Sequence, residues 1–412
     1  MRILVVGAGA REHALCWRLA RSTSVERLLV APGNPGMDAI ATRVPVEATD
    51  GEGLTSLALR EAVDLAVIGP EAPLVAGVAD ALRAAGIPTL GPSAAAARIE
   101  GSKSWAMDLC HRHGIPAPRA ERAADARGAL ALAASWPLPA VIKADGLMAG
   151  KGVVIAATRE EAQQAARAFA QHGPVVFEEF LEGAELSAFA LCDGVRAVPL
   201  GYARDHKRLL PGNTGPMTGG MGAFTPVPDV TPELAARVAP ILQGAVDAMA
   251  QEGCPYTGFL FAGLMLTQDG PRVLEFNCRL GDPEAQALLP LLAGDPVPLW
   301  LRAARGALTP DDKVAWLPGA ALGVVLASPG YPQATAPGQE IAGLGADGQV
   351  PGGGAICFHA ATRRDGAWRT AGGRVLTLVG TGPDLAAARA VAYEAVVRVT
   401  FIGAQWRPDI GG

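Results

Sequence analysis

The sequence has few cysteines, and none of them stands in a pattern typical of metal binding or redox chemistry. Six cysteines are spread over 412 residues without a C-x-x-C spacing. Zinc and redox motifs are therefore not expected, and reduced thiols in the cytoplasm are the expectation. The N-terminus also lacks the apolar segment of a signal peptide, because Met1-Arg2 leads directly into a predicted strand.

Long apolar runs and an excess of one charge are missing as well. No apolar run has the length of about 20 residues that spans a membrane, so we expect no membrane partner. The 35 Lys and Arg and 40 Asp and Glu residues leave a net charge of −5, without a long run of one sign. Nucleic-acid binding needs a basic stripe, so we expect small-molecule partners and no nucleic acid.

Glycine and proline are abundant, and an alternation of strands and helices opens the chain. The 51 glycines and 33 prolines are not periodic, so they predict frequent turns and phosphate loops. The first 90 residues predict a parallel sheet of about four or five strands. The predicted strands are 2–6, 28–30, 64–68 and 89–90, and the predicted helices are 12–21, 51–62 and 75–85.

Ligands of such sheets bind at the carboxyl ends of the strands. Gly9, Asn34 and Glu71 all fall at these ends, so we predict that they help to form a polar pocket. Taken singly, Asn34 and Glu71 could instead be turn formers or caps.

The first glycine turn is similar to the dinucleotide-binding fingerprint but departs from it twice. Strand 2–6 leads through Gly7-Ala8-Gly9 into a helix, and such a helix N-terminus favours anions. Glu12 stands at the third glycine position, and no acid follows the second strand. NAD binding is therefore disfavoured, and an NAD-dependent dehydrogenase is the alternative from another class.

A predicted strand around residue 275 carries groups that suit a metal beside phosphates. Glu275 and Asn277 lie two apart and so project from one face of the strand. A carboxylate and an amide oxygen suit a hard cation such as Mg²⁺. Arg279 continues the alternation and offers a fork of donors to a carboxylate or phosphate. An exposed strand face with ordinary polar residues is the alternative.

Lysines and a glycine loop upstream suit nucleotide phosphates. Ser102 is the expected N-cap of a predicted helix, 102–113, which places Lys103 in the first turn, where a bound anion is a natural partner. Lys143 ends the predicted strand 140–143. A glycine loop with Gly150, Lys151 and Gly152 then leads into a second strand, which we expect to pair antiparallel with the first as a hairpin. This order is not that of a Walker loop, and it predicts a mobile lid over phosphates. The alternative is that Lys103, Lys143 and Lys151 are solvated side chains that bind no phosphate.

An acidic segment and a basic segment follow. Strand-end backbone at Glu179 to Leu181 could bind an adenine edge, with Phe180 or Leu181 against its face and Glu185 on a ribose hydroxyl. The alternative is that these residues are only a charged strand end.

Residues 205–208, Asp-His-Lys-Arg, suit a substrate phosphate or the γ-phosphate. The alternative is that they form a solvated turn. The stretch 212–222 has so much glycine that we expect no regular structure there and a close approach to a ligand.

The order of these parts resembles that of the ATP-grasp carboxylate–amine ligases, and within them the phosphoribosylamine–glycine ligases. The resemblance covers nearly the whole chain and rests on segments 7–13, 33–36, 69–74, 143–152, 205–208, 219–222 and 275–284. The chain departs from the usual pattern at Cys278, Leu280, Met148, Asn213 and Met217. The last two replace a usual carboxylate and a usual amide.

The predicted fold has three parts. An α/β N-terminal parallel-sheet domain is expected over 1–100. An α+β ATP-grasp domain follows over 101–319, with a mobile lid subdomain at about 116–190. From residue 320 the pattern changes to short strands and a helix at about 384–400, which predicts a small α+β C-terminal domain over 320–412. We expect no catalytic constellation in that last part and a role in closing the active site.

The resemblance implies a reaction and assigns roles. ATP, glycine and 5-phosphoribosylamine would give glycinamide ribonucleotide, ADP and phosphate through glycyl phosphate, a step of purine biosynthesis. ATP with Mg²⁺ or Mn²⁺ would be the cofactors, and a monomer is expected, with a weak dimer as the alternative. Glu275 and Asn277 would hold the metal, and Arg279 and Lys207 would be catalytic.

The remaining roles concern binding. The ATP-binding set would be Lys103, Lys143, Gly150, Lys151, Gly152, Glu178, Glu179, Phe180, Leu181 and Glu185. The substrate-binding set would be Gly9, Asn34, Glu71, Asp205, His206, Arg279 and Asp282. Two other functions share the nucleotide parts: a biotin-carboxylase-like or other purine carboxylating ligase, and a nucleotide sensor without catalysis.

Overall fold

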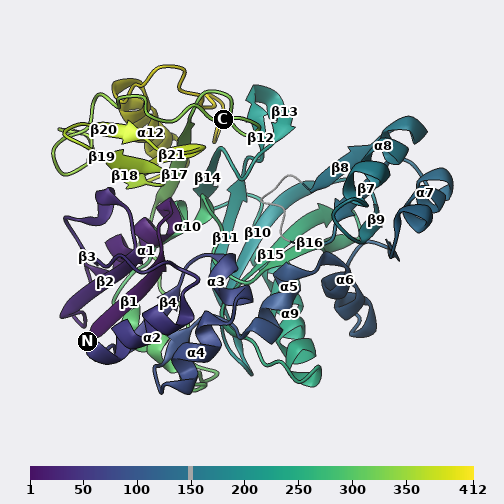
Figure 1. Cartoon of the computed structure of the whole chain (residues 1–412), viewed down its shortest axis with the longest axis horizontal. Helices are drawn as coiled ribbons and strands as arrows, with labels where there is room; N and C mark the ends of the chain where they lie inside the picture. The colour runs from purple at the N-terminus through teal and green to yellow at the C-terminus, as the bar shows by residue number, and fades with distance from the viewer. Residues whose placement is uncertain (147–151) are drawn as a thin grey trace.

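A computed structural model describes residues 1–146 and 152–412, and its N-terminal part is the predicted parallel sheet (Figure 1). Its five strands run in the order β3-β2-β1-β4-β5, and every pair is parallel. The strands are β1 (Arg2–Gly7), β2 (Arg27–Pro32), β3 (Thr42–Arg43), β4 (Leu65–Ile68) and β5 (Thr89–Leu90). The helical segments are α1 (Ala10–Leu19), η1 (Pro35–Met37), α2 (Gly51–Arg60), α3 (Glu71–Val75) and α4 (Val78–Ala84).

The expected single helix over 75–85 is wrong in its bounds. Gly77 has φ +83°, a left-handed conformation that an α-helix does not accommodate, and it separates α3 from α4. Glu71 therefore begins a short helix of its own, and its carboxylate lies at the carboxyl edge of the sheet, just after β4.

The next part forms an arm that projects from the body at the right of Figure 1. Helices α5 (Ala94–Gly101) and α6 (Lys103–Arg112) lead into a four-stranded sheet, order β6-β9-β7-β8. This sheet and the helices packed on it are β6 (Ala120–Ala123), α7 (Ala126–Ser135), β7 (Ala140–Ala144), β8 (Val153–Ala156), α8 (Arg159–Phe169) and β9 (Val175–Glu179). The arm has its own core around Trp136 and Phe177, so it can behave as a separate packing unit.

The body contains an eight-stranded sheet in the order β16-β15-β10-β11-β14-β17-β21-β18. Its strands are β10 (Ala184–Asp193), β11 (Ala197–Asp205), β14 (Gly222–Thr225), β15 (Thr257–Thr267), β16 (Gly270–Asn277), β17 (Ala320–Ala327), β18 (Ile356–His359) and β21 (Arg374–Gly382). Strand β14 pairs with β17, so the sheet runs without a break into the C-terminal part of the chain.

Helices cover both faces of this sheet. Buried residues of α9 (Pro232–Gln251) and α12 (Leu385–Arg398) pack on one face. On the other face lie α10 (Glu284–Leu288), η3 (Leu289–Leu291), α11 (Val297–Ala304) and the N-terminal α1. A small sheet of β19 (Thr362–Arg364) and β20 (Trp368–Thr370) completes the C-terminal part. Among the described residues, no helix combines the length and apolar character needed to cross a membrane.

The expectation of no regular structure over 212–222 is wrong. Strands β12 (Arg208–Leu210) and β13 (Thr214–Met217) form a short hairpin around η2 (Pro211–Asn213), and β14 begins at Gly222. Gly212 and Asn213 take positive φ angles of +68° and +54°, which turn the chain tightly enough for the two strands to pair. Glycine here closes a turn rather than preventing pairing.

Candidate active site

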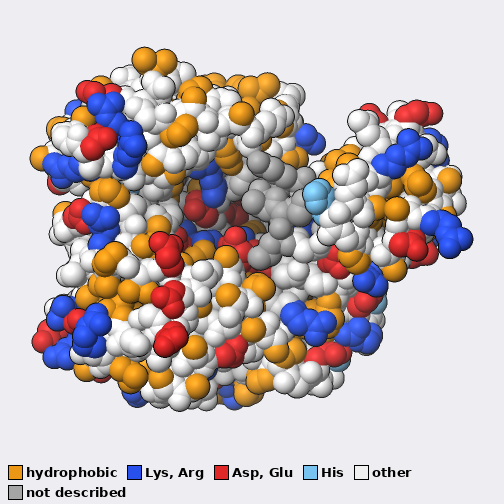
Figure 2. Space-filling view, viewed as in Figure 1, with side chains coloured by type: hydrophobic (Ala, Val, Ile, Leu, Met, Phe, Trp, Pro, Cys, Tyr) orange, Lys and Arg blue, Asp and Glu red, His pale blue; other side chains and the backbone are white. Residues whose placement is uncertain are grey.

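A hollow lies between the N-terminal and C-terminal parts, and side chains of both charges gather inside it (Figure 2). Predicted substrate and metal residues lie at the ends of β1, β4, β11 and β16 and in the turn before α10. The described residues of the predicted ATP-binding set belong to, or directly adjoin, α6, β7, β8, β9 and β10.

Strand β16 ends at Asn277, which is 8% exposed, and Glu275 lies two residues before it. Lys207 Nζ is 3.6 Å from Glu275 Oε1 and 3.4 Å from Glu185 Oε2. Burial alone would raise the pKa of Glu275, but Lys207, with Lys143 and Lys103, lowers it to about 2. Burial would likewise lower the pKa of Lys207, yet Glu185 and Glu275 raise it, so both groups stay charged.

An ionised carboxylate beside an amide oxygen is a donor set that Mg²⁺ accepts, so Glu275 and Asn277 fit the predicted metal role. In the described part of the chain, His, Cys, Asp and Glu side chains form no cluster of three that could hold a metal ion. Further ligands would therefore be oxygens of a bound phosphate or water. The Asn277 Nδ2 is buried without a hydrogen-bond partner within the described residues, whereas Asn277 Oδ1, the atom that would bind a metal, accepts from Arg279 Nη2 at 3.0 Å.

Arg279 lies beyond the strand, because β16 ends at Asn277 and the expected alternation stops there. Its Nη2 donates to Glu100 Oε1 at 2.8 Å and to Asn277 Oδ1 at 3.0 Å, and its Nε donates to Glu71 Oε2 at 3.3 Å. Burial would lower the pKa of Arg279, but Glu100 and Glu71 raise it. The guanidinium thus joins α3, α5 and the end of β16, and its contacts with Glu71 and Asn277 join three predicted site residues.

The predicted phosphate lysines both contact neighbouring parts of the arm. Lys143 is 5% exposed, and its Nζ lies 2.8 Å from Glu178 Oε2 and donates to the Leu274 carbonyl at 2.9 Å. Ser102 caps α6 as expected, and the Lys103 Nζ donates to the Gly146 carbonyl at 2.7 Å. Gly150 and Lys151 lie outside the described residues. Gly152 is described, and its carbonyl accepts from Ala144 N–H at 2.8 Å, in the antiparallel hairpin of β7 and β8 that was predicted.

The predicted adenine segment lines a cleft of about 470 Å³. Its walls include Glu179, Phe180, Leu181 and, across from them, Arg272. Arg272 Nη1 pairs with Glu179 Oε1 at 2.5 Å, while Glu178 faces away toward Lys143. Burial raises the pKa of Glu178. Glu185 belongs to β10, beside Lys207, and does not line the cleft.

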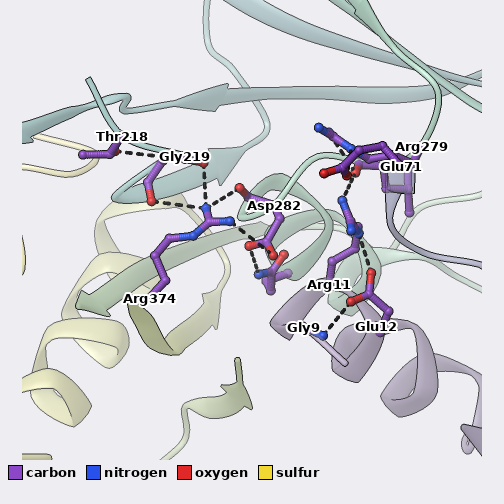
Figure 3. Close-up of polar contacts among 12 residues, drawn as sticks. Gly9, Arg11, Glu12, Glu71, Thr218, Gly219, Arg279, Asp282 and Arg374 are labelled. Atoms are coloured by element: carbon purple, nitrogen blue, oxygen red, sulfur yellow. Dashed lines mark hydrogen bonds and ion pairs between the residues drawn. The ribbon is translucent and has the colours of Figure 1, made fainter. Parts of the chain in front are cut away.

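The N-terminal glycine turn already carries an anion from the chain itself. Glu12 is 2% exposed, and its Oε2 accepts from Gly9 N–H at 2.6 Å, while its Oε1 pairs with Arg11 Nε at 2.6 Å (Figure 3). Helix α1 begins at Ala10 rather than at residue 12. A Cβ at Gly69 would lie 2.2 Å from Glu12 Oε1, so that glycine makes room for the carboxylate. The Gly9 N–H is therefore not open to a substrate phosphate.

Asn34 makes its hydrogen bonds within the protein. Its Nδ2 donates to the carbonyls of Ala8 (2.7 Å) and His359 (2.8 Å), and its Oδ1 accepts from Gly36 N–H (2.9 Å). Both amide hydrogens are used, which favours the alternative of a turn former and cap. Asn34 joins the glycine turn of the N-terminal sheet to the end of β18.

The segment 205–208 directs only part of its charge at the site. Arg208 Nη1 donates to the Gly215 carbonyl of its own hairpin at 2.9 Å, so it does not join a common cationic cluster. Burial, with a contribution from Arg407, lowers the pKa of His206 to about 4. His206 is therefore neutral near pH 7, and Lys207 carries the charge that faces Glu275.

Asp205 lies next to an acid that sequence reasoning passed over, Glu284. Asp205 Oδ1 accepts from His206 N–H at 2.6 Å, and Glu284 Oε1 accepts from Ser187 Oγ at 3.0 Å. Burial raises the pKa of both carboxyls, and Glu284 adds to the effect on Asp205. Glu284 follows Asp282-Pro283 in a recognisable segment, so the sequence did carry a signal for it.

The C-terminal part contributes a side chain to this region, Arg374, which the sequence analysis did not single out. Arg374 of β21 donates through Nη1 to the Asp282 carbonyl at 2.5 Å, and its Nη2 lies 3.4 Å from Asp282 Oδ2 (Figure 3). Burial would raise the pKa of Asp282, but Arg374 lowers it. The sequence analysis did not single out Glu100 either. Arg374 and Glu100 do not stand in a local motif that would mark them as site residues.

Comparison with known proteins agrees with this arrangement. Models of phosphoribosylglycinamide synthetase match the chain in three stretches: the N domain at residues 1–100, the ATP-grasp (A) domain at 101–285 and the C domain at 321–412. Curated phosphoribosylamine–glycine ligases from Rhizobium meliloti and Vibrio parahaemolyticus are 46% and 44% identical. Each alignment covers 100% of this chain and 98% of the relative.

Solved structures give the same result. A phosphoribosylamine–glycine ligase from Thermotoga maritima superposes with a TM-score of 0.87 at 35% identity over 100% of both chains. The biotin carboxylase domain of Hydrogenobacter thermophilus 2-oxoglutarate carboxylase has a TM-score of 0.73 at 16% identity, over 98% of this chain and 91% of that one, and so shares the fold alone. With three domain models and full-length relatives in agreement, the chain belongs to the phosphoribosylglycinamide synthetase family.

Proposed function

We propose that this chain catalyses the ATP-dependent ligation of glycine to 5-phosphoribosylamine, which gives glycinamide ribonucleotide, ADP and phosphate in purine biosynthesis. The observation that carries the proposal is its 46% identity with a phosphoribosylamine–glycine ligase over the full chain. The chemistry of the hollow is compatible with it, because acids, lysines and arginines meet there as phosphoryl transfer requires.

The reaction must first activate a carboxylate. Glycine carboxylate is a poor electrophile, because it is charged and has no good leaving group. Transfer of the γ-phosphoryl group of ATP to it gives glycyl phosphate, and the ribosylamine nitrogen then displaces phosphate. The protein's part is positioning and charge neutralisation.

In this proposal Lys103 and Lys143 hold the nucleotide phosphates, together with the predicted lid residues Gly150, Lys151 and Gly152. The cleft beside Glu179 to Leu181 takes the adenine. Glu275 and Asn277 hold Mg²⁺, which neutralises phosphate charge when bound. Magnesium is favoured by the donor set and by the biotin carboxylase domain from Hydrogenobacter, which was solved with MgADP. Mn²⁺ is the alternative.

Lys207 would stabilise charge on the transferring phosphoryl group, because its Nζ lies 3.6 Å from the metal-binding carboxylate of Glu275. Among the carboxylate contacts of Arg279, the longer one, to Glu71 at 3.3 Å, is the one that a substrate carboxylate would replace. Asp205, His206 and Asp282 would then contact the second substrate. Gly9 and Asn34 would support this site through the backbone of the glycine turn.

ADP release from the purified protein with ATP and Mg²⁺ tests the proposal. Glycine and freshly made phosphoribosylamine are added singly and together. Release that requires both substrates supports the ligase. Release that ignores glycine, or that responds to bicarbonate instead, would retain the fold and reject the named substrates. A molar mass by light scattering in the same buffer tests the further proposal that the enzyme acts as a monomer.

A further inference from the structure

Both backbone groups of Gly219 are bonded to side chains of the C-terminal part. The Gly219 N–H donates to Tyr331 Oη at 3.0 Å, and the Gly219 carbonyl accepts from Arg374 Nη1 at 2.6 Å. Figure 3 shows Arg374 between Gly219 and Asp282, whose carbonyl accepts from the same Nη1. We call Tyr331, Arg374 and the Gly219 backbone the Gly219 clamp. It fixes the turn before β14 against the turn before α10.

The clamped turn is bonded directly to Lys207. Thr218 donates to the Lys207 carbonyl twice, through its backbone N–H at 2.8 Å and through its Oγ1 at 2.7 Å. Thr218 is 5% exposed, and its Oγ1 also accepts from Gly220 N–H at 3.0 Å. A continuous set of hydrogen bonds therefore leads from Arg374 through Gly219 and Thr218 to the backbone of Lys207.

Lys207 needs such support. Its side chain is a flexible four-carbon stem with a point charge, so the place of its Nζ depends on where the backbone is held. The hairpin beside it offers little packing, because residues 210–215 are exposed. The backbone of His206 pairs with Gly222 and Met221, and hydrogen bonds from the C-terminal part restrain the Gly219 turn beside it.

We propose that Tyr331 and Arg374 are positioning residues, which hold the Gly219 turn and thereby place Lys207 against Glu275 for phosphoryl transfer. This inference rests on the proposed function for the meaning of Lys207. It gives the C-terminal part a role in the rate of the reaction and not only in closing the site. Arginine suits the role, because its Nη1 donates to the carbonyls of both turns while its Nη2 lies 3.4 Å from the Asp282 carboxylate, and the planar fork holds the two nitrogens in place.

Steady-state kinetics with matched variants tests the clamp. Tyr331→Phe removes only the acceptor oxygen, and Arg374→Lys keeps the charge but loses the fork. Arg369→Gln on β20 is the control, because the side chain of Arg369 contacts Asp365, Glu340 and the Gly338 carbonyl, none of which belongs to the clamp. We expect kcat to fall about 10- to 100-fold in the clamp variants. The KM for ATP should stay within about twofold, and the control should match wild type.

A second background separates positioning from general destabilisation. The second background is the variant Lys207→Met. If the clamp acts through Lys207, adding Arg374→Lys to Lys207→Met should lower kcat by less than about twofold. If Arg374→Lys lowers kcat as much in Lys207→Met as in the wild type, the proposal is wrong.

Hydrogen exchange gives a readout that does not need activity. Amides of the segment 212–222 should exchange at least about tenfold faster in both clamp variants than in wild type or Arg369→Gln. Unchanged exchange rejects the clamp, whatever the kinetics. A wild-type protein that releases ADP without glycine rejects the proposed function instead, so the two failures are distinguishable.

Discussion

The carboxylate of Glu275 is kept ionised by lysines from three separate parts of the chain. Lys207, Lys143 and Lys103 together outweigh the effect of burial on its pKa. Such an arrangement keeps a full negative charge on Glu275 in spite of its burial. In the proposed function this charge would help to hold a divalent cation beside the nucleotide phosphates.

Glu275→Gln should lower the rate of ADP release by at least about 100-fold, because a neutral amide replaces the charged ligand. The Mg²⁺ concentration for half-maximal rate should rise as well. Glu185→Gln is the control, since it removes the other carboxylate beside Lys207 and should leave the Mg²⁺ requirement unchanged. A rate within a few-fold of wild type for Glu275→Gln would contradict the metal assignment.

Lys143→Met should weaken ATP binding by about 10- to 100-fold, the value of a hydrogen bond to a charged group. It should also destabilise the fold by about 3 kcal/mol, because Glu178 is then a buried carboxylate without a partner. The double variant Lys143→Met/Glu178→Gln should recover stability but not affinity. Calorimetry and urea unfolding measure the two effects, and unchanged ATP affinity in the single variant would reject the role of Lys143.

At the scale of elements, η1 and β18 are joined by one side chain, Asn34, although they lie more than 300 residues apart. Three hydrogen bonds of Asn34 satisfy the carbonyls of Ala8 and His359 and the N–H of Gly36. Its role is to hold the glycine turn of the N-terminal sheet against the C-terminal part, so its substitution should act on stability before it acts on chemistry.

Asn34→Ala should lower the free energy of unfolding by about 3 kcal/mol, because three buried backbone groups lose their partner. Asn34→Asp keeps the acceptor for Gly36 and should lose less. The midpoint of urea unfolding measures the loss of stability in the two variants, provided that the slope of the unfolding transition is unchanged. An alanine variant as stable as wild type would show that water or backbone movement replaces these bonds.

Elements whose signals are local could be predicted from the sequence. The parallel strands of the first domain, the Ser102 cap, and the hairpin of β7 and β8 depend on short apolar runs and neighbouring turn residues. The order of lysines, acids and glycines also allowed the main site segments to be chosen. The β12–β13 hairpin was missed, because a glycine-rich segment can both close a turn and resist order.

The contacts that complete the site could not be predicted, because they join distant segments. Arg279 meets Glu100 across 179 residues, and Arg374 meets Gly219 across 155. Nothing in the sequence around Glu100 or Arg374 marks the partner. Glu12 is an intermediate case. Its place in the glycine turn was noticed, but only the structure shows its carboxylate on the Gly9 N–H.

Across the whole molecule, two buried histidines join the N-terminal helix α1 to the C-terminal strand β18. The His359 N–H donates to His13 Nδ1 at 2.9 Å, and both rings are fully or nearly fully buried. Burial lowers the pKa of both rings, that of His359 to about 4. The two rings are therefore neutral at pH 7, and His13 can accept a hydrogen bond.

Stability should fall as the pH drops from about 6.5 to about 4. The unfolded chain binds protons on these rings near pH 6.5, whereas burial lowers the pKa of both rings in the folded chain, that of His359 to about 4. For His359 the loss of stability should reach about 2 kcal/mol by pH 5, and the loss from His13 has the same sign. His13→Asn keeps an acceptor but does not titrate, so its melting temperature should change less between pH 7 and pH 5. An equally steep fall in this variant would show that other groups dominate.

The hydrogen bonds between β14 and β17 bear on how the gene can be divided. A break after residue 319 leaves one fragment ending before β17 and another beginning with it, so each exposes an unpaired sheet edge. Such edges aggregate or pair with any strand available. Fragments 1–319 and 320–412 made together should therefore recognise each other and reassemble, whereas either fragment made alone should precipitate. The same feature makes this junction a poor site for an inserted tag and a good one for a split reporter.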